Sequence, residues 1–302
     1  MAKGSRPSPA TLTATLSLAI AAISTAAVLV RLSDAPALVL AFYRLAIASV
    51  LLAPVALLRE GSRDALASLE RGELVRLAGV GLVLALHFWS WFESLEHTTV
   101  AASVVLVTLH PVFVGLASDR LYGEGLGRLG WIGVVVALVG GIVITGADAR
   151  LGLGNAFGDL LALIGAAAAA AYFLAGRGYR QDLPLLAYVV PVYAASAVGL
   201  AGASLAAGHA FTGYAVDEWV IFLALAIVPM ILGHTLLNYA LAYVSAPVVA
   251  TTVLGEPIGS SLLAWLVLAE VPPWGTALGA LVVLAGIGLV VFDEERPDAA
   301  EG

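Results

Sequence analysis

The chain has 302 residues, of which 61% are hydrophobic and 12% are charged, and it contains no cysteine. Soluble domains usually carry about a quarter charged residues, and a water-soluble core cannot use this much apolar surface. The missing cysteine excludes disulfides, zinc fingers and thiol catalysis, and the net charge of −7 argues against a nucleic-acid partner, which needs a basic surface.

Ten apolar runs follow in chain order, each near the length of about 20 residues that crosses a bilayer core as a helix. The first run follows Lys3 and Arg6, as the core of a signal peptide does, but it is longer than such a core, so we expect a retained helix. The sequence therefore predicts an all-α integral membrane protein with ten transmembrane helices, at 12–32, 36–58, 74–94, 99–118, 129–147, 157–176, 184–206, 219–242, 246–268 and 274–292.

The cationic residues predict the orientation of these spans, because Lys and Arg near span ends are retained on the cytoplasmic side. With the amino terminus inside, eleven of the fourteen cationic residues fall in inner segments. Outer loops hold only Arg31 and Arg150, and Arg44 lies within the second span. We therefore expect a multi-pass protein of the cytoplasmic membrane with both termini in the cytoplasm.

An internal repeat appears when the chain is compared with itself at an offset of 146 residues. This offset aligns five pairs of identical or functionally related residues: His110 with Glu256, Pro111 with Pro257, Glu124 with Glu270, Gly133 with Gly279, and Gly140 with Gly286. Each half holds an odd number of spans, so the second copy is inverted relative to the first. We expect two inverted five-helix repeats, 1–150 and 151–302, joined by the Gly-rich link "ADARLGLGNAFG", with a short acidic tail.

Several segments resemble a known family. They are "FYRLAIASVLLAP" in the second span, the Glu124 and Glu270 loops with the glycine-patterned helices after them, and "GDLLALIGAAAAAAYFLAGR" at the start of the second half. The chain is similar in these segments to ten-helix, EamA-like members of the drug/metabolite transporter superfamily. The resemblance implies a central cavity built by the first four helices of each half, with the fifth and tenth helices as peripheral supports.

His110 and Glu256 lie near the middle of the fourth and ninth spans. Ionisable groups at that depth cost about 3 kcal/mol on insertion scales and usually face a cavity or a partner. A purely structural hydrogen bond, for instance from a tyrosine hydroxyl to Glu256, is the alternative. Pro111 and Pro257 follow them directly, and each is expected to kink its helix and leave carbonyl groups free toward the cavity.

Other polar residues of the spans are candidates for the same cavity. His87, Trp91 and Ser94 share one helix face by their spacing, and so do His234 and Asn238. Arg44 lies too deep to reach the surface easily. It either binds a substrate carboxylate or interacts with Glu256, or its long side chain extends to the lipid headgroups.

These features favour a secondary transporter that moves a small metabolite by alternating access, with export of amino acids or related compounds as the expectation from the family resemblance. An intramembrane enzyme with His110 and Glu256 as acid and base is the alternative, and the chain has neither an H-E-x-x-H nor a G-x-S-x-G motif. A third reading is a facilitator without proton coupling. No cofactor or metal is expected, and the expected partners are a small-molecule substrate, membrane lipid and, in the coupled case, protons.

Overall fold

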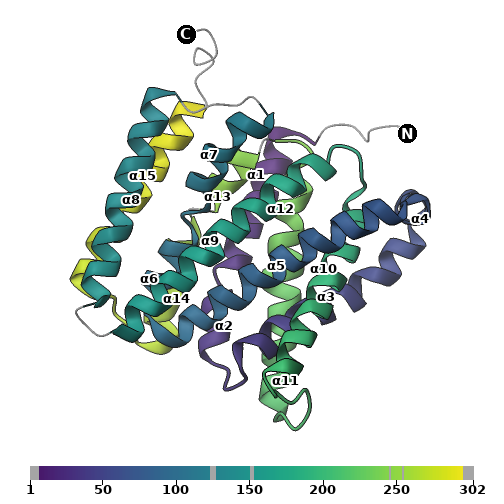
Figure 1. Ribbon diagram of the computed structural model, residues 1–302, viewed down its shortest axis with the longest axis horizontal. Helices are drawn as coiled ribbons and strands as arrows, with labels where there is room; N and C mark the ends of the chain where they lie inside the picture. The colour runs from purple at the N-terminus through teal and green to yellow at the C-terminus, as the bar shows by residue number, and fades with distance from the viewer. Residues whose placement is uncertain (1–6, 123–126, 150–152, 245, 254, 295–302) are drawn as a thin grey trace.

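The computed structural model describes residues 7–122, 127–149, 153–244, 246–253 and 255–294, and every regular element among them is helical (Figure 1). Eight of these helices are long and apolar enough to cross a membrane. Two shorter apolar helices, Arg128–Ile144 and Trp274–Gly286, occupy the fifth and tenth positions. The predicted all-α membrane fold is confirmed.

The first five spans run from the amino terminus to the middle of the chain. They are α1 (Pro9–Ile23) with α2 (Ala26–Arg31), then α3 (Ala37–Leu58), α5 (Arg71–His97), α6 (Val100–Val107) with α7 (His110–Tyr122), and α8 (Arg128–Ala149). Helix α4 (Glu60–Ser68), a short helix in the loop after the second span, was not predicted from the sequence. A reciprocal capping box between Glu70 and Glu73 starts α5 immediately after it.

The second five spans repeat this order. They are α9 (Leu153–Tyr179), α10 (Leu185–Ala206), then α11 (Val216–Leu225) continued by the π-helix η1 (Ala226–His234) and α12 (Thr235–Ala240), then α13 (Ala246–Thr252) with α14 (Gly255–Leu268), and α15 (Trp274–Glu294). The predicted Gly-rich link is shorter than expected, because α8 continues to Ala149 and α9 already begins at Leu153.

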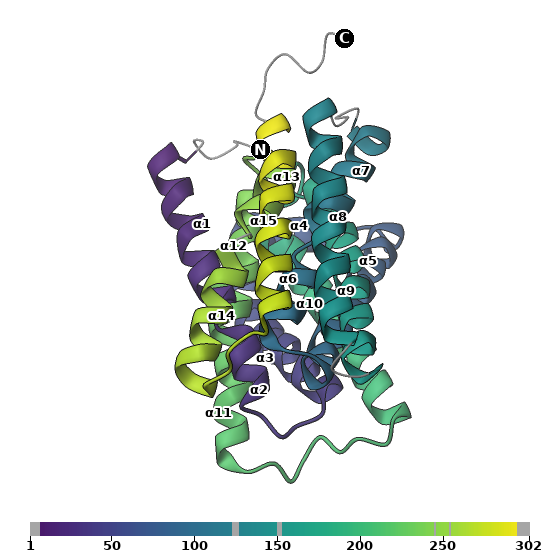
Figure 2. The same ribbon diagram turned by 90° about the vertical axis from the view of Figure 1, so that its left-hand side faces the viewer.

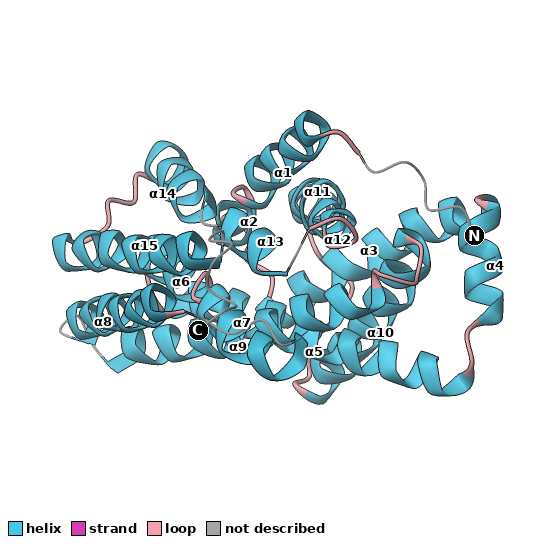
Figure 3. Cartoon of the chain, turned by 90° about the horizontal axis from the view of Figure 1, so that it is seen from above, coloured by secondary structure: helices cyan, strands magenta, loops and turns pink. Residues whose placement is uncertain are grey.

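Helices α8 and α15 lie side by side at one edge of the molecule (Figures 1 and 3). Their contact is made by backbone against backbone at repeat-equivalent glycines. A Cβ atom on Gly140 would lie 2.6 Å from the Val283 nitrogen, and one on Gly286 would lie 2.3 Å from the Ala137 nitrogen. Because no side chain fits there, these glycines fix the close approach of the two peripheral helices.

The start of α1 and the end of α15 lie at the same end of the helix bundle (Figure 2). An even number of spans requires this arrangement. The side of the membrane on which this end lies remains a prediction from the cationic residues.

The fourth and ninth spans are interrupted at equivalent positions. Helix α6 ends at Val107 and α7 begins at His110, while α13 ends at Thr252 and α14 begins at Gly255. Pro111 and Pro257 therefore lie in the first turn of a new helix, where a missing N–H costs nothing, and do not bend a continuous one as predicted. The interruptions place His110 and Glu256 at helix starts in the interior of the bundle.

Candidate functional site

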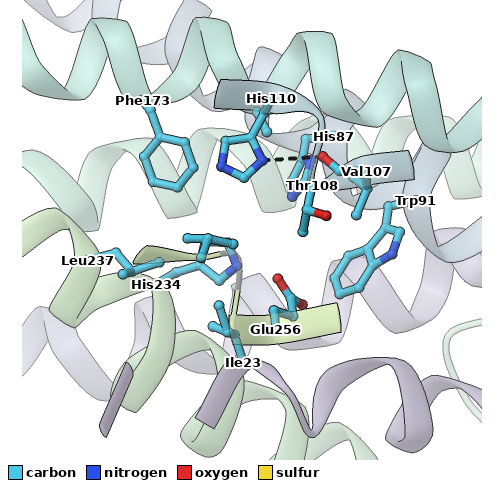
Figure 4. Close-up of a pocket in the computed structure, with 12 residues that line it drawn as sticks. Ile23, His87, Trp91, Val107, Thr108, His110, Phe173, His234, Leu237 and Glu256 are labelled. Carbon is cyan, nitrogen blue, oxygen red and sulfur yellow. Dashed lines mark hydrogen bonds between the residues drawn. The ribbon is translucent and has the colours of Figure 1, made fainter. Parts of the chain in front are cut away.

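A narrow cavity of about 20 Å³, room for about one water molecule, lies at these interruptions, between the two halves of the chain (Figure 4). Its walls come from α1, α5, α6, α7 and α9, from η1 and α12, from Val253 before α14, and from the start of α14. The lining residues are Ile23, His87, Trp91, Val107, Thr108, His110, Ala169, Phe173, His234, Leu237, Val253 and Glu256. Five of the seven site residues predicted from the sequence are among them.

The polar side chains of the cavity wall are almost completely buried. None of the five predicted side chains on its wall, His87, Trp91, His110, His234 and Glu256, is more than 8% exposed. The cavity in this conformation is too small for a metabolite, so a substrate reaches these side chains only when the helices around it separate.

Two of the three histidines of the wall, His87 and His110, are fixed by backbone carbonyls and aromatic rings. Nδ1 of His87 donates to the Gly165 carbonyl at 2.9 Å, and Nδ1 of His110 donates to the Val107 carbonyl at 3.2 Å. The His110 ring also stacks on Phe173, with centroids 5.2 Å apart. These contacts leave the second ring nitrogen of each histidine as the one available for a ligand.

Glu256 is the only acidic side chain among the described residues of the cavity wall, and its carboxylate points toward the open space between His234 and Trp91 (Figure 4). Among the described residues, no donor lies within hydrogen-bond distance of this carboxylate. Nδ1 of His234 and Nε1 of Trp91 also lack partners in the described part of the chain. Buried polar atoms without partners are costly, and here they surround a space that a ligand can fill.

Arg44 lies behind the cavity wall and not on it. Its guanidinium is fully buried, with the carbon 4.1 Å above the centre of the Phe88 ring. Nη2 donates to the Pro229 carbonyl at 3.4 Å, within the π-helix, while Nη1 has no partner among the residues that the structure describes. The snorkelling alternative is thereby wrong, because the side chain turns inward. The side chains of Arg44 and Glu256 do not form an ion pair with each other in the described part of the chain.

Asn238 is the second predicted residue that does not line the cavity. Its amide nitrogen donates to the Tyr172 hydroxyl at 2.7 Å and to the His234 carbonyl at 2.7 Å. Asn238 therefore fixes the end of the π-helix that carries His234, and the structure gives it a supporting position next to the wall.

Several parts of this site were not predicted from the sequence. Thr108, Ala169 and Phe173 line the cavity, but they are ordinary residues of apolar runs and carry no signal of their own. The π-helix was also missed, although Pro229 in the eighth span pointed to an irregularity there. In the described residues, no group of three His, Asp or Glu side chains is arranged to hold a metal ion.

A helical membrane bundle whose two duplicated halves place ionisable side chains around one buried cavity has an architecture typical of transporters. The chain belongs to the EamA-like transporter family, which matches residues 8–146 and again 156–292. The two matches establish the duplicated architecture that the 146-residue offset predicted. This is a family of transporters and not of enzymes, so the acid-base enzyme alternative is set aside.

Two curated relatives agree with this assignment. The chain is 26% identical over 256 residues to the pseudopaline exporter CntI of Pseudomonas aeruginosa (strain UCBPP-PA14), covering 84% of this chain and 86% of the relative. It is 23% identical over 210 residues to the uncharacterized transporter YdfC of Bacillus subtilis (strain 168), covering 68% and 67%. A solved crystal structure shares the fold with a TM-score of 0.71 at 21% identity, over 96% of this chain and all of that one.

Proposed function

We propose that this transporter exports a small polar metabolite carrying an amino group, an amino acid or a related compound, by alternating access. The observation that carries the proposal is the carboxylate of Glu256, which has no hydrogen-bond partner among the described residues and faces the cavity beside aromatic rings. A carboxylate and the faces of Trp91 and Phe173 together suit an ammonium group. The relation to an exporter of pseudopaline supports the outward direction.

Two further wall atoms that lack partners among the described residues suit the other end of such a substrate. Nε1 of Trp91 donates only, and Nδ1 of His234 donates when its tautomer or charge allows. Both are therefore suited to the carboxylate of an amino acid. Arg44 contributes a positive charge from behind the wall without touching the substrate.

Glu256 is also proposed to change protonation during the cycle, so that transport is coupled to protons. The carboxyl group faces water when the transporter opens to one side of the membrane, and it is enclosed when the transporter is closed. These are two different environments for its proton. Competition between a proton and the substrate ammonium for the same carboxylate provides the coupling. A facilitator in which Glu256 has only a binding role is the rival mechanism.

The test is counterflow in proteoliposomes loaded with a panel of metabolites. Amino acids and larger amino-carboxylates should exchange, while matched compounds without the amino group should not. Exchange that favours neutral or purely anionic metabolites would refute the proposed role of the Glu256 carboxylate in selecting the substrate.

A further inference from the structure

Glu270 joins three helices at the end of the bundle predicted to face outward. It lies in the loop after α14, in the second half of the chain. One carboxylate oxygen accepts from the backbone nitrogen of Val100 at 2.6 Å, at the start of α6. The other lies 3.3 Å from Nη2 of Arg31, at the end of α2. A second-half carboxylate thus holds the outer ends of the first and fourth spans.

Arg31 extends this joint to the third span. Its Nη1 donates to the Leu95 carbonyl near the end of α5, at 2.6 Å. The helices joined in this way, α2, α5, α6 and the end of α14, continue the helices that form the cavity wall. The Arg31 and Glu270 contacts therefore join the ends of these helices on one side of the cavity.

A second carboxylate of the same half acts nearby. Glu218, in the first turn of α11, accepts from the Ser33 hydroxyl and from the backbone nitrogen of Asp34 at 2.8 Å. Both residues belong to the loop after the first span. Two second-half carboxylates thus satisfy polar groups of the first half at the outer end.

The repeat supplies a comparison for the arginine. Residues 31 and 177 differ by the 146-residue offset, and so do 95 and 241. In the second half, Nη1 of Arg177 donates to the Leu241 carbonyl at 3.1 Å, which reproduces the Arg31 contact with Leu95 at the opposite end of the bundle. The repeat equivalent of Glu270 is Glu124, which lies outside the described residues. The comparison therefore covers the arginine contact alone: each half has it, and in the first half Glu270 of the second half adds a contact between the halves.

We infer that Glu270 is the outer latch of the transport cycle: its contacts with Arg31 and with the Val100 nitrogen hold the cavity closed on that side and break when the cavity opens outward. The inference rests on alternating access as proposed above, and it assigns a role to a residue far from the cavity. Because the pair is partly exposed, with Arg31 at 33% and Glu270 at 17%, its strength is modest. A weak contact is suitable here, because the substrate must be able to shift the equilibrium between the closed and the outward-open conformation.

The experiment uses the full chain, which has no native cysteine, with one reporter thiol at Ala169→Cys on the cavity wall. An impermeant thiol reagent is added to sealed vesicles, without substrate, from the side on which a thiol at Asp217→Cys reacts. Glu270→Gln keeps an acceptor for Val100 but loses the charge pair with Arg31. It should raise the labelling rate of the reporter by about twofold to fivefold, the range that a partly exposed ion pair supplies.

Glu96→Gln is the matched control, since Glu96 is an exposed carboxylate near the end of α5 that forms no ion pair with Arg31 in the described part of the chain. It should label at the parent rate. In an Arg31→Ala background, where the partner is already lost, Glu270→Gln should add little. An unchanged labelling rate in Glu270→Gln, or equal effects of this change with and without Arg31, would overturn the latch. Labelling needs no substrate, so a wrong substrate assignment cannot produce either result.

Discussion

Glu256 carries the chemical part of the proposed mechanism, because its carboxylate is the acidic group on the described cavity wall. It starts α14 at the break of the ninth span, and its repeat-equivalent residue, His110, starts α7 at the break of the fourth. The two halves thus contribute two titratable groups of different kind to one space. Of these two groups, only Glu256 provides a negative charge for a cationic group or a proton.

Replacing Glu256 by Gln keeps the side-chain volume and its hydrogen bonding but removes titration. We expect pH-driven accumulation of substrate in proteoliposomes to fall at least tenfold, with what remains independent of pH. Exchange at equal pH on both sides should be reduced less, because it needs no net proton movement. The measurement is uptake against an imposed pH gradient, compared with counterflow at matched pH.

Glu256→Asp is the control for this change, since it retains a titratable carboxyl group and should retain pH dependence. If Glu256→Gln accumulated substrate in response to pH as the parent does, Glu256 would have no part in coupling. The facilitator mechanism would predict that result.

The sequence predicted the residues of the wall better than their partners. His87, His110, His234 and Glu256 were recognisable because an ionisable side chain in an apolar run needs a special environment. Arg44 satisfied the same criterion, but its position behind the wall depends on Phe88 and on a carbonyl of the π-helix. Those contacts are set by helix rotations, which a uniformly apolar span does not encode.

At the scale of elements, the pairing of α8 with α15 depends on glycines that have no room for a side chain. Gly286 faces the backbone of Ala137, whereas Gly288, two residues later on α15, has no neighbouring atom within 4 Å of the point where a Cβ atom would lie. The same substitution to alanine can therefore be made at a crowded position, Gly286, and at an open one, Gly288.

Gly286→Ala should lower the thermal stability of the detergent-solubilised protein, because its methyl group forces the two helices apart. Overpacking of this kind costs about 1–3 kcal/mol. Gly288→Ala should leave the melting temperature unchanged or raise it slightly, since alanine favours a helix by roughly 0.5–1 kcal/mol. Equal melting temperatures for the two variants would contradict the backbone-to-backbone contact.

The repeat was readable from the sequence, but the irregular elements were only partly so. An offset of 146 residues aligns chemically distinctive residues, so it required no structure. The proline pairs correctly located the irregular points of the fourth and ninth spans. They did not reveal whether each helix bends or stops, because that depends on which neighbouring groups satisfy the released backbone.

At the scale of the whole molecule, the two ends of the bundle differ in charge. The loops around α4 and the end of α9 hold arginines, whereas the end near α11 holds Asp217 and Glu218 (Figure 1). This asymmetry predicts that the α4 end lies in the cytoplasm.

Thiol labelling in intact cells checks the orientation. A thiol at Asp217 should react with an impermeant reagent, and one at Arg63 should react only after the membrane is made permeable. Both positions are exposed in the structure and need no conformational change to react. The reverse pattern would invert the topology and the direction of every proposed transport step.

Transport through the central cavity is the claim on which the rest depends, and substrate counterflow with a blocked cavity tests it most directly. Ala169 is a small residue of the cavity wall and Val198 is 73% exposed on the outside of α10. Ala169→Trp should fill the cavity and reduce counterflow of an accepted metabolite at least tenfold, while Val198→Trp, at equal reconstitution, should exchange it at the parent rate. Equal counterflow by the parent and the correctly folded Ala169→Trp protein would show that the substrate takes another path.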